Sequence, residues 1–340
     1  MFYSSFIRLN NIQKYVGKRT LKTLSYGKGI PDEIVYEKSD FPKNKILTTL
    51  KDETLAVIGF GPQGIAQSLN MIDSGLDVIV GVRENGNSWS KAIKNGFIPD
   101  KNLFSIEEAC KRGTILMNLL SDSAQNEVFP IIKENLKPSN SLYFSHGFGL
   151  VFNKYTNINI DDLEDIDVFM VAPKGSGASV RSLYLEGKGI NSSYAIHRDW
   201  SGKSLNKALS IGFAIGSPYI YETSFKNEVY SDLTGERSIL MGGIAGLFKA
   251  QYDILRERGH SPSESFNETV EEALASLYPL IHKKGMDYMF SNCSTTAQRG
   301  ALDWMPEFER INRPLIEKIY DNVKNGEETC KVINSNSDKN

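Results

Sequence analysis

The chain has 340 residues, 40% of them hydrophobic and 24% charged, a composition typical of a globular protein long enough for two domains. Its formal net charge of −2 gives no sign of a nucleic-acid-binding surface. The three cysteines (Cys110, Cys293 and Cys330) are far apart and odd in number, so neither a disulfide framework nor a zinc pattern is predicted. A reducing compartment is therefore expected.

The first 31 residues differ from the rest in charge. They contain lysines, arginines and hydroxyl residues, and the first acidic residue is Asp32. This composition is typical of an organellar transit peptide. We predict a transit peptide over residues 1–31 and a location in the mitochondrial matrix, with the plastid as the alternative. A disordered basic arm is the other interpretation.

The most informative stretch runs from Leu55 to Arg83. A short apolar run, residues 55–58, predicts a buried strand, and the turn 59–64 with the pattern G-x-G-x-x-G follows it. A helical pattern and a second apolar run, residues 78–82, complete a βαβ unit. Glycines at such a turn allow a pyrophosphate to approach the backbone, so we predict dinucleotide binding. The alternative is a tight turn with a purely structural role.

Short apolar runs alternate with helical patterns as far as residue 218, which predicts a doubly wound parallel sheet over residues 32–218. Helical periodicity then dominates, so residues 219–330 are predicted to form a second, helical domain. We place the boundary near Ser217 and Pro218. The Asn/Ser-rich tail, residues 331–340, is predicted to be disordered.

Arg83 ends the second predicted strand, where a domain specific for NAD would have an acidic residue. A guanidinium group with Asn87 and Ser88 nearby suits a 2′-phosphate, which favours NADPH. Glu84 weakens this interpretation because its charge would repel the phosphate. A solvated surface arginine is the alternative.

Two pairs of carboxylates occur in the predicted helical domain. Asp232 and Glu236 are four residues apart, as are Glu268 and Glu272, so each pair would share one helix face. Carboxylates without histidine or cysteine suit a hard cation such as Mg²⁺. Two solvated helix faces are an equally good interpretation from the pattern alone.

Three further residues have both a functional and a structural interpretation. Lys174 and His146 each follow an apolar run and stand beside glycines, which suggests close approach of a ligand. A surface residue in a turn is the more usual interpretation of Lys174, and His146 has the same ambiguity. Ser294, in a cluster of hydroxyl residues, could cap a helix or bind a carboxylate.

Ordered segments between Leu55 and Thr329 together resemble the ketol-acid reductoisomerase (acetohydroxyacid isomeroreductase) family, in its short form closest to the fungal mitochondrial type. They include AVIGFGPQG, GVRENGNSW, YFSHGFG, VAPKGSG, SDLTGERSILMGG, GHSPSESFNETVEE and GMDYMFSNCSTTAQRGALDW. The resemblance implies an N-terminal Rossmann-type sheet domain and a knotted C-terminal helical domain. It implies NADPH, two Mg²⁺ ions, and a homodimer or larger homo-oligomer with active sites between subunits.

The resemblance also implies roles for individual residues. Asp232, Glu236, Glu268 and Glu272 match the metal-binding carboxylates, and Ser294 matches the serine that holds the substrate carboxylate. His146 and Lys174 match active-site residues, and we expect Glu272 to relay a proton. The matches to cofactor contacts are Gly59, Phe60, Gly61, Pro62, Gln63, Gly64, Arg83, Ser88, Asp122, Ser123, Ala124, Gln125 and Gly177.

The implied activity is Mg²⁺-dependent alkyl migration in 2-acetolactate or 2-aceto-2-hydroxybutyrate, followed by reduction by NADPH to a 2,3-dihydroxy acid. This reaction belongs to the biosynthesis of valine, isoleucine and leucine. Two other functions combine a dinucleotide-binding domain with a helical domain. One is a metal-independent β-hydroxyacid dehydrogenase, and the other is an inactive dinucleotide-binding regulator.

Overall fold

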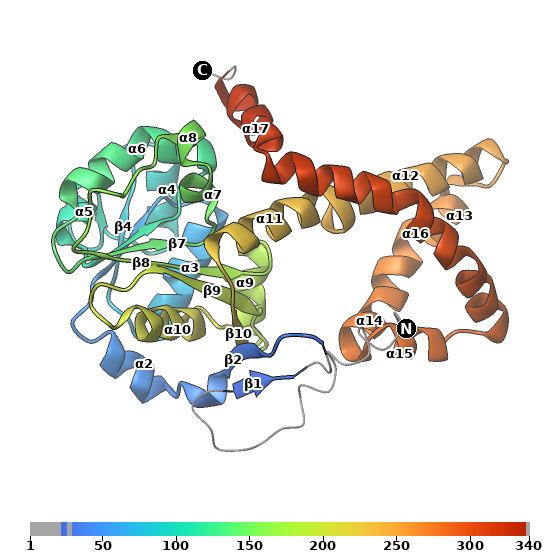
Figure 1. Ribbon diagram of the computed structural model, residues 1–340, viewed down its shortest axis with the longest axis horizontal. Coiled ribbons are helices and arrows are strands. Elements are labelled where there is room, and N and C mark those ends of the chain that lie inside the picture. The colour runs from blue at the N-terminus through green and yellow to red at the C-terminus, as the bar shows by residue number, and fades with distance from the viewer. Residues whose placement is uncertain (1–21, 26–28, 338–340) are drawn as a thin grey trace. The chain divides into compact units, whose positions relative to one another are not determined.

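The computed structural model describes residues 22–25 and 29–337. These divide into two compact units, shown in Figure 1. The sheet unit consists mainly of residues 32–229, and the helical unit of residues 230–327. Among the described residues, no helix combines the length and the apolar character needed to cross a membrane.

The sheet unit contains a ten-stranded sheet in the order β1-β2-β10-β9-β8-β7-β6-β3-β4-β5. From β8 to β5 all neighbouring strands are parallel, with Leu55 of β3 aligned with Val78 of β4 and Ile115 of β6. The strands are β1 (Lys22–Leu24), β2 (Glu33–Glu37), β3 (Leu55–Ile58), β4 (Val78–Gly81), β5 (Leu103–Phe104), β6 (Ile115–Asn118), β7 (Ser141–Phe144), β8 (Asp167–Pro173), β9 (Ser192–Arg198) and β10 (Tyr219–Glu222).

Helices cover both faces of this sheet, because successive residues of a strand point to opposite sides. Leu55 and Val57 pack into one core cluster with α2, α3 and α10, whereas Ala56 and Ile58 pack into another with α5 and α6 (Figure 1). The helices are α2 (Lys43–Thr49), α3 (Pro62–Asp73), α4 (Asn87–Lys94), α5 (Ile106–Arg112), α6 (Asp122–Asn135), α7 (Phe148–Val151), α8 (Asn153–Thr156), α9 (Gly177–Leu185) and α10 (Ser204–Ala214), with a 3₁₀ turn η2 (Lys38–Asp40).

The doubly wound architecture is confirmed, but the prediction of a parallel sheet is wrong at one side. Strand β9 runs antiparallel to β8, and β2 runs antiparallel to β10 and β1. Gly187 and Gly189 both have positive φ and turn the chain after α9, so β9 enters the sheet beside β8 in the opposite direction. An added Cβ at Gly189 would lie 1.8 Å from the carbonyl oxygen of Gly216, so no side chain fits there.

The units separate later in the chain than the boundary predicted near Ser217 and Pro218. Strand β10 follows that boundary and pairs with β9, and the units divide between Val229 and Tyr230, inside α11 (Phe225–Gly235). The helical unit then contains η3 (Glu236–Leu240), α12 (Gly242–Glu257), α13 (Pro262–Phe266), η4 (Asn267–Glu271), η5 (Ala273–Leu277), α14 (Tyr278–Lys284), α15 (Met286–Ser291) and α16 (Thr295–Lys324). The knot implied for this domain stays a prediction.

Three turns of the helical unit, η3, η4 and η5, are π-helical. In η3 the backbone at Ser238 leaves helical geometry, with φ −102° and ψ −112°. Short π-helical turns replace the regular hydrogen bonds of an α-helix, and they are frequent at functional sites. The predicted metal ligands Glu236 and Glu268 lie within these turns, and Glu272 stands between the last two.

The described residues contain secondary structure within both predicted terminal segments. Residues 331–337, predicted to be disordered, belong to α17 (Glu327–Ser337), in which Val332 and Ile333 are partly buried. Strand β1 lies inside the predicted transit peptide and pairs with β2. A cleaved segment that left the sheet intact would therefore end before Lys22. Residues 1–21 and 26–28 of the predicted peptide lie outside the described residues.

Candidate active site

The glycines of the turn after β3 have three different roles. Gly59 has a φ of +98°, and an added Cβ there would lie 2.9 Å from the carbonyl oxygen of Leu119. At Gly64 a Cβ would lie 2.3 Å from the oxygen of Gly59, so this glycine lets α3 pack closely on β3. At Gly61, an added Cβ would have no neighbouring atom within 4 Å. This is the arrangement that a pyrophosphate needs in order to approach the helix N-terminus.

The other residues of the turn differ in what they offer a cofactor. Phe60 is 1% exposed and packs edge-on against Phe97, so only its backbone is available. Pro62 is exposed at the first position of α3. The side chain of Gln63 donates to the carbonyl oxygen of Gly175, 3.0 Å away. Gly177 packs on the same turn, since a Cβ there would lie 2.2 Å from the oxygen of Pro62.

Arg83 and Ser88 lie at the end of β4 and the start of α4. The chain turns between Arg83 and Gly86, whose N–H donates to the carbonyl oxygen of Arg83 at 3.3 Å. Arg83 and Glu84 are both exposed, and Ser88 is in the first turn of α4. A 2′-phosphate at this helix N-terminus would have a guanidinium group, a hydroxyl and free N–H groups within one turn of chain.

Asp122, Ser123 and Ala124 form the first turn of α6, at the carboxyl end of the parallel strands. Gln125, in contrast, is 4% exposed, and its amide bonds to Asn118 and to the carbonyl oxygen of Leu120. It therefore holds the end of β6 to α6, and its side chain is not offered to solvent.

Two predicted catalytic side chains meet on a third residue. Lys174 Nζ donates to Glu228 Oε1 at 2.7 Å, and the Nδ1 of His146 donates to Glu228 Oε2 at 3.0 Å. Glu228 is 2% exposed, whereas the side chains of Lys174 and His146 are 28% and 24% exposed. The buried carboxylate thus holds both partly exposed side chains in position. Because an ionised carboxylate only accepts, Nδ1 carries the proton of this hydrogen bond.

The electrostatics of this cluster follow from its geometry. Burial by itself would raise the pKa of Glu228. The hydrogen bond and charge of His146, with those of Lys174, outweigh burial and lower this pKa to about 2. Glu228 is therefore an anion throughout the physiological range, and it accepts hydrogen bonds from both Lys174 and His146.

Gly147 allows α11 to come this close. A Cβ at Gly147 would lie 2.9 Å from the ring of Phe225 and 3.2 Å from Val229, both buried on α11. The His146-Gly147 pair after β7 and the first turns of α11 are thus in direct contact. This explains how a histidine and a glutamate 82 positions apart in the chain form one pair.

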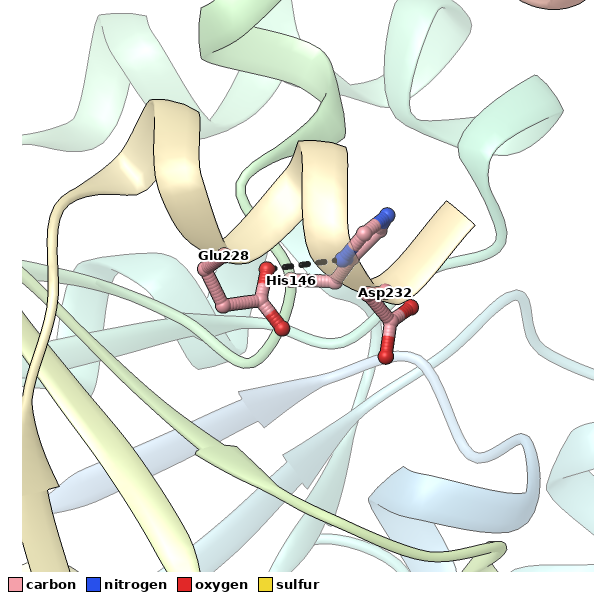
Figure 2. Close-up of side chains that lie close together, drawn as sticks. All are labelled: His146, Glu228 and Asp232. Carbon is pink, nitrogen blue, oxygen red and sulfur yellow. Dashed lines mark hydrogen bonds and ion pairs between the residues drawn. The ribbon is translucent and has the colours of Figure 1, made fainter. Parts of the chain in front are cut away.

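Asp232 stands one turn beyond Glu228 on the same helix, as Figure 2 shows. One potential ligand atom from each of His146, Glu228 and Asp232 lies within 4.8 Å of the other two. The spacing of Glu228, Asp232 and Glu236 is i, i+4, i+8, which places carboxylates along one side of a helix. The predicted pair Asp232–Glu236 is therefore part of a longer acidic series.

The second predicted pair, Glu268 and Glu272, lies on η4 and at the start of η5, and both residues are exposed. The described residues contain one group of three or more potential metal ligands, and it includes neither Glu236, Glu268 nor Glu272. No such group of described residues therefore combines members of the two predicted pairs. Ser294 is exposed and caps α16, accepting from the N–H of Ala297 at 3.2 Å.

Glu228 is not among the site residues predicted from the sequence, where it only counts as another nearby acid. The signal that could have identified it is its spacing of four from Asp232 together with the apolar neighbours Phe225 and Val229. These predict that the helix face with Glu228 turns toward the sheet, where a buried carboxylate needs cationic partners.

Comparison with known proteins places this site in a family. The family model for the NADPH-binding domain of acetohydroxy acid isomeroreductase matches residues 49–219, and the model for the C-terminal domain of ketol-acid reductoisomerase matches residues 225–340. The chain belongs to the ketol-acid reductoisomerase family.

Individual relatives agree with this assignment. The chain is 56% identical to the mitochondrial ketol-acid reductoisomerase of Neurospora crassa, over 94% of this chain and 78% of that protein. It is 54% identical to the mitochondrial enzyme of Saccharomyces cerevisiae, over 96% of this chain and 82% of that protein. Among solved structures, an NADH-preferring ketol-acid reductoisomerase from an uncultured archaean superposes with a TM-score of 0.80 at 31% identity, covering 89% of this chain and 90% of that one.

These matches confirm three predictions made from the sequence: the ketol-acid reductoisomerase family, the sheet domain followed by a helical domain, and an enzyme of the oxidoreductase/isomerase class. The roles of individual site residues remain predictions.

Proposed function

We propose that this reductoisomerase converts 2-acetolactate, or 2-aceto-2-hydroxybutyrate, to the corresponding 2,3-dihydroxy acid with NADPH and Mg²⁺. The observation that carries the proposal is the cluster of Lys174, His146 and Glu228 at the carboxyl end of the sheet, next to Asp232 on α11. The product serves the biosynthesis of branched-chain amino acids.

The donor set suits two Mg²⁺ ions. Asp232 and Glu236 on one segment and Glu268 and Glu272 on another are carboxylates with no cysteine among them, as a hard cation requires. Glu268 and Glu272 are exposed and make no side-chain ion pair among the described residues. When bound, such ions would withdraw electron density from the oxygen atoms of a 2-hydroxy-3-oxo acid, which favours alkyl migration.

The chain's own side chains perform the remaining tasks. Glu228 holds the ammonium group of Lys174 in position, so that it can donate to an oxygen atom of the acidic substrate. The same carboxylate orients His146. Ser294, at the N-terminus of the long helix α16, would hold the substrate carboxylate with its hydroxyl and the free N–H groups of that turn. We assign the proton relay to Glu272.

We assign the cofactor as NADPH. Arg83 and Ser88 at the start of α4 supply the cationic and hydroxyl groups that a 2′-phosphate needs, and the matching family model is that of an NADPH-binding domain. Glu84 beside Arg83 limits this preference, and the solved relative prefers NADH. We therefore expect NADPH to be preferred rather than required.

The helical unit supports an oligomer with shared active sites. Its apolar side chains are unusually exposed for a folded unit, with Trp304 at 65% and Met241 at 64%. Other exposed members are Ile239, Leu240, Ile254, Phe308, Ile311 and Leu315. A second copy covering this surface would bury it, and it would also bring Glu268 and Glu272 of one chain to Asp232 and Glu236 of the other.

The mitochondrial matrix is the proposed location. The two fungal relatives are mitochondrial enzymes, and the basic, acid-free segment before β1 suits a transit peptide.

An assay of NADPH absorbance with 2-acetolactate, with and without Mg²⁺, tests the proposed function. We expect NADPH consumption in Mg²⁺, loss of it in EDTA, and a fall of about 100-fold or more for Asp232→Asn. Asp161→Asn, an exposed carboxylate in the sheet unit, is the matched control. Activity that persists in EDTA would favour a metal-independent β-hydroxyacid dehydrogenase, and NADPH binding without turnover would favour a regulator.

A further inference from the structure

A buried amide lies beneath the dinucleotide turn. Gln67, on α3 one turn after Gln63, is 0% exposed and has hydrogen bonds on both ends of its side chain. Its Nε2 donates to Gln63 Oε1 at 3.0 Å and to Ser145 Oγ at 2.7 Å. Its Oε1 accepts from the hydroxyl of Tyr143 at 2.9 Å.

Each of these partners belongs to a different functional loop or to the strand before it. Gln63 is part of the dinucleotide turn and donates onward to the carbonyl oxygen of Gly175, next to Lys174. Ser145 precedes His146 and donates to the carbonyl oxygen of Val171 in β8, at 3.1 Å. Gln67 thus bonds directly to the segment after β3 and to the end of β7, and it is connected to the end of β8 through Gln63 and Ser145.

The chemistry of the partners determines the direction of most of these hydrogen bonds. A carbonyl oxygen only accepts, so Gln63 must donate to Gly175 and Ser145 must donate to Val171. This leaves the oxygen atoms of Gln63 and Ser145 as acceptors for the two N–H bonds of Gln67. Tyr143 then offers its only proton to Gln67 or Val171. A substitution at residue 67 would therefore remove the hydrogen bonds to Gln63, Ser145 and Tyr143 together.

We propose that Gln67 is a positioning residue, which holds the dinucleotide turn in register with the loops that carry His146 and Lys174. This inference rests on the proposed function, because it concerns how the cofactor is aligned with the reacting groups. Close contact already joins these loops, since Gly177 packs against Pro62. Gln67 adds hydrogen bonds to that contact, and these fix the orientation of the segments. A displacement of about 1 Å between cofactor and catalytic groups can cost about 100-fold in rate.

Asn70 provides a matched control on the same helix. It is also 0% exposed, and its amide bonds to the carbonyl oxygens of Val180 and Ile215 and to Arg181. These partners join α3 to α9 and α10 and lie away from the dinucleotide turn. Asn70→Leu therefore shows the effect of losing a buried amide on α3 while the dinucleotide turn stays aligned with the loops of His146 and Lys174.

The test compares Gln67→Leu, Ser145→Ala and Asn70→Leu in the full-length enzyme. We measure kcat, the KM for NADPH and for 2-acetolactate, the Kd for NADPH by fluorescence without turnover, and Tm. For Gln67→Leu we expect kcat to fall about tenfold or more and the Kd for NADPH to rise severalfold. Ser145→Ala should change both in the same direction by less. Asn70→Leu should lower Tm with kcat and Kd within about twofold of the wild type.

Kinetic constants of Gln67→Leu and Ser145→Ala that match those of Asn70→Leu would overturn the inference. If Gln67→Leu does not fold, Ser145→Ala decides the matter, because it removes one hydroxyl from a partly exposed position. The Kd measurement is independent of turnover. An inactive wild type would therefore refute the proposed function while the role of Gln67 is still decided by NADPH binding.

Discussion

At the scale of single residues, the buried carboxylate of Glu228 is the feature that most clearly separates this site from a set of exposed acids. It has two cationic or proton-donating partners within 3.0 Å, and its pKa is about 2. Lys174 and His146 were predicted from strand ends and glycines, which place a residue at a sheet edge. Their common partner comes from a helix that begins about 50 residues after Lys174, and no local pattern predicts such a contact.

We expect Glu228→Gln to lower kcat about 100-fold. Glutamine has about the same volume as glutamate, so the protein should still fold, but its neutral amide cannot form ion pairs with Lys174 and His146. Above about pH 4, the kcat of the wild type should show no pH-dependent change caused by titration of Glu228, since this carboxylate stays ionised there. Measurement of kcat against pH for both proteins checks this. Glu127→Gln, an exposed residue of α6, is the control; equal loss in the two variants would contradict the assigned role.

At the scale of elements, the first βαβ unit was predictable because each of its signals is local. An apolar run, three glycines at fixed spacing and a second apolar run specify β3, α3 and β4 within a few residues. The direction of β9 and the strand β10 were not predictable in this way. Their pairing is decided by long-range contacts such as the close approach of Gly189 to Gly216, which leave no local periodicity.

A second, structural ion pair joins elements far from the candidate site. Lys207 of α10 is 5% exposed and bonds to Asp167 at the start of β8, to Glu53 and to the hydroxyl of Ser141. Burial by itself would raise the pKa of Asp167, but its hydrogen bonds from Ser201 and the charge of Lys207 lower it below its usual value. The stability from this pair is thus present above the ordinary pKa and is lost as the pH falls through the lowered one.

Asp167→Asn should therefore lower the free energy of unfolding by about 3 kcal/mol at neutral pH, with a smaller difference from the wild type below about pH 4. Urea unfolding at several pH values measures this difference. A difference that stays constant down to about pH 2, or grows on acidification, would show that the charge of Asp167 is not what stabilises these elements.

At the scale of the whole molecule, the sequence predicted a dinucleotide half and an acidic half, and the described chain contains both. Among the described residues, no close group of three potential metal ligands combines members of the two carboxylate pairs. Asp232 lies beside Glu228 and His146, whereas the exposed residues Glu268 and Glu272, on and beside the π-helical turns, are not members of that group. Sequence spacing could suggest each pair, but in the proposed oligomer a second copy brings the pairs together, and no spacing within one chain encodes that contact.

The most direct test of this account is complementation between two inactive variants, Asp232→Asn and Glu272→Gln, purified separately and then mixed under conditions that exchange subunits. If each site takes one pair from each chain, a mixed dimer has one doubly altered site and one intact site. The mixture should then consume NADPH with 2-acetolactate and Mg²⁺ at about a quarter of the wild-type rate. A mixture as inactive as its components, under conditions where mass spectrometry shows mixed dimers, would contradict the shared site.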